Sequence, residues 1–189
     1  MTDPNFDETV LNPETIKLTE AAKARKPILD RYADGGWILV QAASGLTPEQ
    51  TQARPGPGDW SLAELVAHLA DSDFVHADRI KRVIAEENPT LQAFPENAWL
   101  DRLHSARMPV DEAAALFGAN RTWVARILRG LDDADFARTG THTELGRQTL
   151  AEIVVKSVHH LDHHLKFLYA KRAKLGVAIY PRYAANPGF

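Results

Sequence analysis

Four of the eight histidines lie within six residues, in the segment SVHHLDHHLKFL. They are His159, His160, His163 and His164, and they form two pairs whose members are four residues apart. On an α-helix, residues with this spacing share a face, so both imidazoles of a pair can reach one metal ion. The spacing therefore indicates a metal site. The alternative is a pair of core histidines whose nitrogens bind carbonyls and water.

The apolar pattern of this segment indicates which pair faces the core. A helix here has an apolar stripe that comprises Leu150, Ile153, Ser157, Phe167 and Leu168. That stripe continues through His160 and His164. The opposite, polar stripe passes through His159 and His163. We therefore expect the first pair to point into the protein and the second pair to point toward solvent or an interface.

A third candidate ligand, His68, lies on a half-apolar face of an earlier helix, in the segment ELVAHLADSD. If this helix runs antiparallel to the histidine-rich helix, His68 lies at about the level of His164. His76 lies two turns further along but is flanked by acidic residues, so we expect it to be more solvated. His68 could therefore form a three-histidine site with His160 and His164.

Three other polar residues are candidates for catalytic roles. Asp71 and Asp73 follow His68 on the same helix and could accept a proton, or they could be solvated surface charges. His142 lies in a loop, in the segment GTHTELG, and loop residues that a rigid scaffold positions often serve function. It could line the mouth of the metal site or cap a turn.

Two capping boxes predict where the histidine-bearing helices begin. Ser61 with Glu64 starts a helix that extends to about residue 88, and Trp60 has the spacing of a hydrophobic staple. Thr149 with Glu152 starts the histidine-rich helix, which extends to about residue 175. The sequence therefore predicts that the candidate ligands lie on two long helices.

Two more long helices complete the expected set. One spans residues 14–44, kinked or broken at Pro27 and the pair Gly35-Gly36, and one extends from Pro109 to Leu128. The link over residues 89–108 reads as irregular, and it is long enough to join two parallel helices. Strand periodicity is nearly missing from the sequence. We therefore predict an all-α protein with a four-helix bundle.

Composition limits the class of protein. The net charge of −3, from 22 basic and 25 acidic side chains, gives no basic surface for nucleic acid or a membrane. There is neither a signal peptide nor an apolar run of membrane-spanning length. With no cysteine, a metal must be held by histidines and carboxylates. We expect a cytoplasmic protein with one domain over residues 1–189, which includes an N-terminal arm and a C-terminal tail.

Three segments, together with Arg79, resemble one family over residues 50–172. They are RPGPGDWSLAELVAHLADSD, GTHTELGRQTL and HHLDHH, and the family is the DinB/YfiT-like superfamily of four-helix-bundle proteins described as metalloenzymes. The family pattern implies His68, His160 and His164 as metal ligands. It also implies an up-down-down-up bundle with a long crossover between the second and third helices. This chain has Asp73 where many relatives have glutamate.

Three histidines leave coordination positions open for water or substrate, which is typical of a catalytic metal site. The resemblance implies a hydrolase, or a transferase that uses a low-molecular-weight thiol, acting on a small molecule. We expect zinc or nickel as the metal, since imidazole suits several transition ions. It also implies a homodimer. The alternatives are a metal-binding protein without activity and a helical interaction protein that uses the outward His159 and His163.

Overall fold

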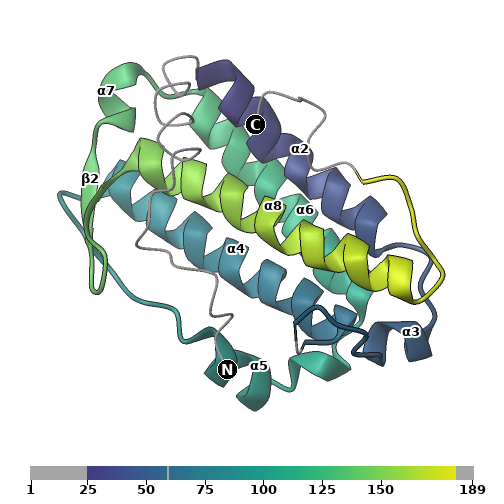
Figure 1. Cartoon of the computed structure of the whole chain (residues 1–189). Coiled ribbons are helices and arrows are strands. Elements are labelled where there is room, and N and C mark those ends of the chain that lie inside the picture. Colours follow the sequence, from purple (N-terminus) through teal and green to yellow (C-terminus); the bar gives the residue numbers. More distant parts are fainter. Residues whose placement is uncertain (1–24, 59, 182–189) are drawn as a thin grey trace.

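The computed structural model describes residues 25–58 and 60–181, and four long helices dominate this part of the chain (Figure 1). They are α2 (Arg25–Ala43), α4 (Leu62–Ala85), α6 (Val110–Arg129) and α8 (Leu150–Lys174). In Figure 1, α4 and α6 run in one direction and α2 and α8 in the other. This is the up-down-down-up course, so the predicted all-α four-helix bundle is confirmed.

The packing order follows from this course. Both α2 and α4 pack against α6 and α8, so α2 lies diagonally opposite α4, and α6 lies diagonally opposite α8. As a consequence, the two helices that carry the candidate ligands, α4 and α8, are antiparallel neighbours.

Both predicted capping boxes are present. The Ser61 hydroxyl accepts the backbone N–H of Glu64, and the Glu64 carboxylate accepts the N–H of Ser61. Thr149 and Glu152 make the same reciprocal pair at the start of α8. Each box satisfies N–H groups that a helix start otherwise leaves unpaired. The predicted starts of both histidine-bearing helices are therefore confirmed.

Helix α2 differs from the sequence prediction because it runs without a break from Arg25 to Ala43. Pro27 lies in the first turn, where its missing N–H removes no helical hydrogen bond. Gly36 lets α2 approach α6 closely, since a Cβ atom there would lie 3.1 Å from backbone atoms of Gly118. The predicted start near residue 14 and the end of the C-terminal tail lie outside the described residues.

A small sheet was not expected from the sequence. Strand β1 (Thr90–Leu91) pairs in parallel with β2 (Thr139–His142), which pairs antiparallel with β3 (Gly146–Thr149). Strands of two to four residues are too short to show the alternation that identifies a strand in a sequence. The sheet ties the link after α4 to the hairpin before α8.

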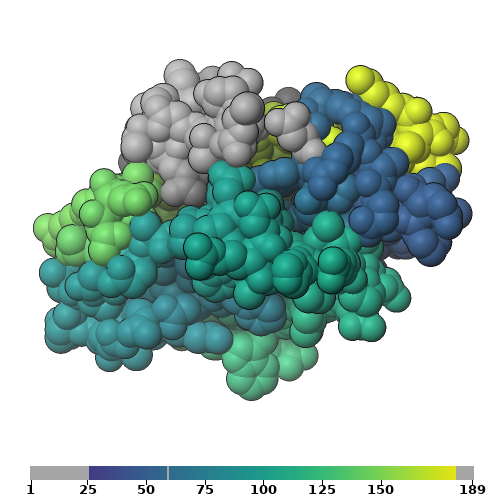
Figure 2. Space-filling model, turned by 90° about the horizontal axis from the view of Figure 1, so that it is seen from below, coloured from purple at the N-terminus to yellow at the C-terminus, as the bar shows by residue number. Residues whose placement is uncertain are grey.

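The link between α4 and α6 is more ordered than predicted. Besides β1 it contains helix α5 (Glu96–Arg102) and a 3₁₀ turn, η1 (Ser105–Arg107). Two further short helices are α3 (Pro48–Gln52) and α7 (Asp133–Phe136). In Figure 2, the teal α5 segment lies in the middle of the visible face, with the green β2–β3 hairpin to its left.

The buried apolar side chains form two clusters, one toward each end of the bundle. Between them lies a polar layer in which Asp73 of α4 binds Arg121 of α6, and both side chains are 1% exposed. The Arg121 guanidinium also lies 4.1 Å from the centre of the Tyr32 ring. On α4, His68 precedes Asp73 of this layer by five residues.

Among the described helices, none combines the length and apolarity needed to cross a bilayer.

Candidate metal centre

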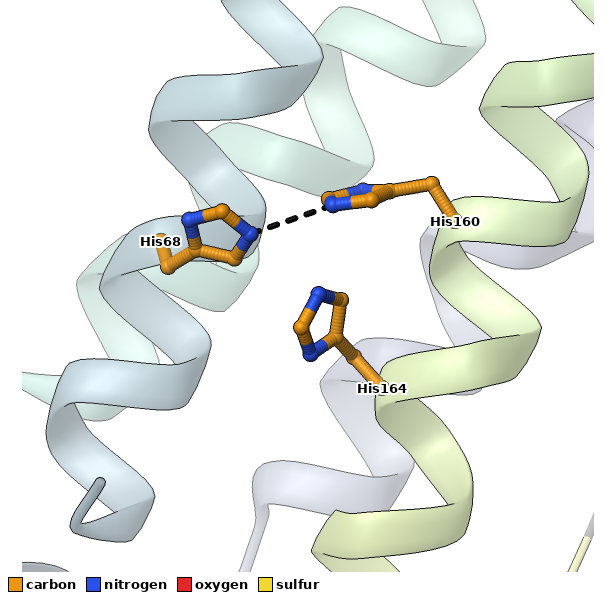
Figure 3. Close-up of side chains that lie close together, drawn as sticks. All are labelled: His68, His160 and His164. Carbon is orange, nitrogen blue, oxygen red and sulfur yellow. Dashed lines mark hydrogen bonds between the residues drawn. The ribbon is translucent and has the colours of Figure 1, made fainter. Parts of the chain in front are cut away.

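Three buried histidines meet between α4 and α8 (Figure 3). His68 projects from α4 and His160 and His164 project from α8, and the three rings point toward one another. One ring nitrogen from each lies within 4.8 Å of the other two. Each residue is at most 7% exposed, so the cluster is enclosed by protein. Among the described residues, this is the group of side chains that can hold a divalent metal ion.

The helix geometry explains why the rings meet. His160 and His164 are one turn apart on α8, and their ring centres are 4.6 Å apart. His68 lies across the helix interface, with its Nε2 3.1 Å from the Nε2 of His160. Two nitrogen ligands of a tetrahedral zinc ion lie about 3.4 Å apart, from a zinc–nitrogen distance of about 2.1 Å. The cluster therefore fits a metal ion with only small side-chain movement.

Burial keeps these histidines neutral. It lowers the pKa of His68 to about 3, and it lowers the pKa values of His160 and His164 well below the usual 6.5. Only a neutral imidazole has the lone pair that a metal needs. The three rings are thus available as ligands at neutral pH.

Ser72 indicates which nitrogen of His160 carries the proton. Its hydroxyl donates to the carbonyl of Leu69, so its oxygen is left as an acceptor for the Nδ1–H of His160, 3.4 Å away. In a neutral ring this leaves the lone pair on Nε2, the atom that faces His68. Hydrogen bonds of this kind orient metal-binding histidines in proteins.

Aromatic rings surround the cluster. Trp60 stacks on His164 with ring centres 5.8 Å apart and also lies 4.8 Å from His68. Phe94 stacks on His68, with the two ring centres 6.0 Å apart. The sequence identified Trp60 only as a hydrophobic staple and gave no role to Phe94. Both make the surroundings of the three histidines apolar, which strengthens electrostatic interactions there.

Glu96 is the functional candidate that sequence reasoning missed. It lies in the first turn of α5, and its Oε2 is 3.9 Å from Nε2 of His68. Its side chain is 28% exposed, so it lies at the edge of the cluster, between the histidines and solvent. Because Glu96 belongs to the link that reads as irregular, no helical periodicity pointed to it.

Comparisons with known proteins place this cluster in a family. A family model described as the DinB superfamily matches residues 38–168. The chain belongs to the DinB superfamily. The matched range contains all three histidines of the cluster.

Individual DinB-type relatives agree in their descriptions. A protein of Bacillus mycoides is 28% identical over 138 residues, 72% of this chain and 79% of the relative. A protein of Oceanobacillus iheyensis is 30% identical over 129 residues, 68% of this chain and 74% of the relative. Both carry the name "putative metal-dependent hydrolase".

One solved structure is similar over most of the chain. YfiT from Bacillus subtilis superposes with a TM-score of 0.70 at 25% identity, covering 80% of this chain and 87% of YfiT. It is described as "a probable metal-dependent hydrolase with an unusual four-helix bundle topology". The resemblance inferred from the sequence motifs is thereby confirmed at the level of family and fold.

The two candidate aspartates lie outside the group of three histidines that can share a metal ion. Asp73 is buried, not solvated, and its carboxylate accepts hydrogen bonds from Arg121 and Asn120. Burial raises its pKa, and these two partners oppose that shift. Asp71 is half-buried, and burial also raises its pKa. The described residues that can share a metal ion include neither carboxylate.

Four other histidines that the sequence singled out differ in burial and in contacts. His159 and His163 are half-buried, in keeping with their position on the outer stripe of α8. His76 is 8% exposed, so the expectation that it would be solvated is wrong: its ring packs 5.6 Å from that of His160. His142 is 3% exposed, and its Nδ1 accepts the backbone N–H groups of the following turn. A turn cap is therefore one role of His142.

Proposed function

We propose that His68, His160 and His164 bind one divalent transition metal, and that the protein is a metal-dependent hydrolase of small molecules. The observation that carries this proposal is the meeting of three buried, neutral imidazoles between α4 and α8. The descriptions of the DinB-type relatives support the reaction class. Zinc and nickel are among the transition ions that suit a set of imidazole ligands.

The ion, when bound by three neutral nitrogens, supplies a Lewis acid that lowers the pKa of water and polarises an electrophile. The residues of the chain then have distinct tasks. The three histidines hold the ion, and Ser72 fixes the ring of His160. Glu96 accepts the proton of the attacking water at Oε2 and returns it to the leaving group. Trp60 limits access of bulk water to the histidines.

Two finer expectations belong to the same proposal. A low-molecular-weight thiol could replace water as the nucleophile, and with no cysteine in the chain it would enter as a cosubstrate. The protein would then be a transferase. A homodimer is also expected from the family resemblance. Light scattering would give about twice the chain mass of 21.0 kDa for a dimer, and a mass of one chain would exclude it.

Metal binding is tested first, by calorimetric titration of chelator-treated protein with zinc and nickel. We expect one ion per chain, and we expect His160→Ala or His164→Ala to weaken binding at least a hundredfold. The matched controls are His159→Ala and His163→Ala on the outer stripe of the same helix, which should leave affinity within about threefold. Equal losses in both pairs would contradict the ligand assignment.

Activity is tested with the metal-loaded protein and a panel of esters, amides and haloalkanes, each with and without added small thiols. Activity without thiol identifies a hydrolase, and activity only with thiol identifies a transferase. Glu96→Gln should retain the metal and lower kcat by about 10²- to 10⁴-fold, the usual contribution of a general base. Buffer rates for every substrate with the metal bound would favour the non-catalytic alternative.

A further inference from the structure

A cluster of basic side chains lies beside the three histidines and has no part in the function proposed above. It comprises His76 and Arg79 from α4, His142 from β2 and Lys156 from α8. We call these four residues the basic cluster. Three of them are at most 8% exposed, which is unusual for charged and polar side chains.

The four residues share one neighbourhood that borders the candidate metal centre. Arg79 lies three residues after His76 on α4 and binds the carbonyl of Gln92, which follows Leu91, the residue paired with His142 between β1 and β2. Lys156 lies one turn before His160 on α8. The ring of His76 in turn lies 5.6 Å from that of His160. A small molecule bound at the three histidines could therefore extend to the basic cluster.

His142 presents a buried donor to this neighbourhood. Its Nδ1 accepts the backbone N–H groups of Glu144 and Leu145, at 3.1 and 3.2 Å, so Nδ1 carries a lone pair. The proton of the neutral ring is then on Nε2, which makes Nε2 a hydrogen-bond donor. That nitrogen is buried and has no hydrogen-bond partner in the described part of the protein. The Nδ1 of His76 is buried without a partner in the same way.

The electrostatic surroundings favour an anion. The cationic groups that act on His76 are Arg79, Arg121 and Lys156, of which Arg121 is paired with Asp73. On His142, Glu144 acts in the opposite direction, more weakly than Arg79 and more strongly than Lys156. Arg79 is held in place because its guanidinium donates to the carbonyl of Gln92 at 2.7 Å. A guanidinium so fixed is well suited to bind a carboxylate or phosphate.

Structural roles account for only some of these atoms. The Arg79–Gln92 hydrogen bond anchors the residue after β1, and Nδ1 of His142 caps the turn between β2 and β3. Neither role uses the Nε2–H of His142. A buried donor without an acceptor costs about 1–3 kcal/mol, and an oxygen of a bound ligand would satisfy the Nε2–H.

We propose that the basic cluster binds an anionic group, a carboxylate or a phosphate, of the small molecule on which the metal centre acts. His142 donates its Nε2–H to an oxygen of that group, and Arg79 and Lys156 supply the positive charge. The substrate is thus an anionic ester or amide whose scissile bond lies at the three histidines. The assignment of this anionic group to the substrate rests on the proposed function, but anion binding itself does not need the metal.

Nuclear magnetic resonance of the histidine rings tests the anion site in metal-free protein. The probes are inorganic phosphate, acetate and acetamide, the last being the neutral isostere of acetate. His76→Asn and His142→Asn assign the two signals. We expect the signals of His76 and His142 to shift saturably with phosphate or acetate and not with acetamide. Absence of a saturable shift, or an equal response to acetamide, would overturn the proposal.

Two charge-removing variants sharpen the test. Arg79→Gln and Lys156→Gln should each raise the dissociation constant of the anion, the first at least tenfold. The matched control is Arg82→Gln, on an exposed position of the same helix where Arg82 pairs with Asp78 and Glu86. Lys156→Gln is at a half-buried position, so it keeps the test valid if Arg79→Gln fails to fold. Equal affinity in all three variants would contradict the assignment.

A last measurement separates the two proposals. If the metal-loaded protein hydrolyses a substrate, phosphate should raise KM without changing kcat, and Arg79→Gln should remove that inhibition. If it hydrolyses nothing while the metal-free protein still binds anions at His76 and His142, the hydrolase proposal fails but the anion site stands. Anion shifts confined to His160 and His164 would refute the anion site and leave the hydrolase proposal intact.

Discussion

At the scale of single residues, the candidate metal centre depends on which ring nitrogens carry protons. Burial keeps the three histidines neutral, and the hydroxyl of Ser72 favours the tautomer of His160 whose lone pair faces His68. Without that hydroxyl, the ring of His160 could carry its proton on either nitrogen. A serine outside the ligand set thus prepares one ligand for the metal.

This leads to a prediction for Ser72→Ala. Removing the hydroxyl should lower metal affinity by about tenfold, at the lower end of the usual effect of such partners, because the tautomer and ring orientation are no longer held. Calorimetric titration with zinc measures the change. Ser157→Ala is the matched control, since Ser157 is also a buried helical serine that donates to a carbonyl of its own helix. A similar loss of affinity in both variants would show that the effect is not specific to His160.

Sequence reasoning found the residues whose positions follow from one helix. The apolar stripe of α8 placed His160 and His164 inside because the period of an α-helix decides it. Sequence reasoning failed for His76, which looks solvated because of its acidic neighbours, and it left the surroundings of Asp73 open. The burial of His76 and Asp73 depends on the neighbouring helices, from which Arg121 binds Asp73. The position of Glu96 beside His68 depends on the path of the link between α4 and α6. Such tertiary contacts leave no periodic pattern in the sequence.

At the scale of elements, the pair of Asp73 and Arg121 joins three helices. Asp73 lies on α4 and Arg121 on α6, and the Arg121 guanidinium also donates to the carbonyl of Ser157 on α8 at 2.8 Å. Asn120 adds a second donor to the carboxylate at 2.7 Å. These contacts fix α4 relative to α8, and therefore fix His68 relative to the two histidines of α8.

We expect Asp73→Ala to lower the free energy of unfolding by about 3–5 kcal/mol, because it leaves the Arg121 charge buried and uncompensated. Urea denaturation measures this loss. Asp78→Ala is the control on the same helix, where the ion pair with Arg82 is exposed, and it should change stability by less than about 1 kcal/mol. If Asp73→Asn kept full stability and metal affinity but lost activity, the catalytic role suggested by the sequence would be supported instead.

The elements themselves were largely predictable from local signals. The two capping boxes predicted the starts of α4 and α8, and Pro109 predicted the start of α6. The break expected in α2 was wrong because proline in a first turn and glycine at a close helix contact are compatible with a continuous helix. The sheet was missed because its strands are short and are stabilised by pairing between distant segments.

At the scale of the whole molecule, the bundle encloses four histidines that burial keeps neutral: His68, His76, His160 and His164. In the unfolded chain each would have a pKa near 6.5. The unfolded chain therefore binds protons below that pH, whereas the folded protein does not. Stability is complete above about pH 6.5 and decreases as the pH falls below it.

We therefore expect metal-free protein to lose about 3 kcal/mol of unfolding free energy between pH 7.5 and pH 6, about 0.8 kcal/mol for each of the four histidines. Urea denaturation in the presence of a chelator at both pH values measures the change. The window stops at pH 6 because burial raises the pKa of Asp162 to about 6, and protonation of Asp162 in the folded state favours folding at lower pH. Zinc-loaded protein should be more stable than metal-free protein at both pH values, since the ion binds the folded state. A free energy of unfolding in metal-free protein that stays constant over this window would show that the four histidines are not kept neutral by burial.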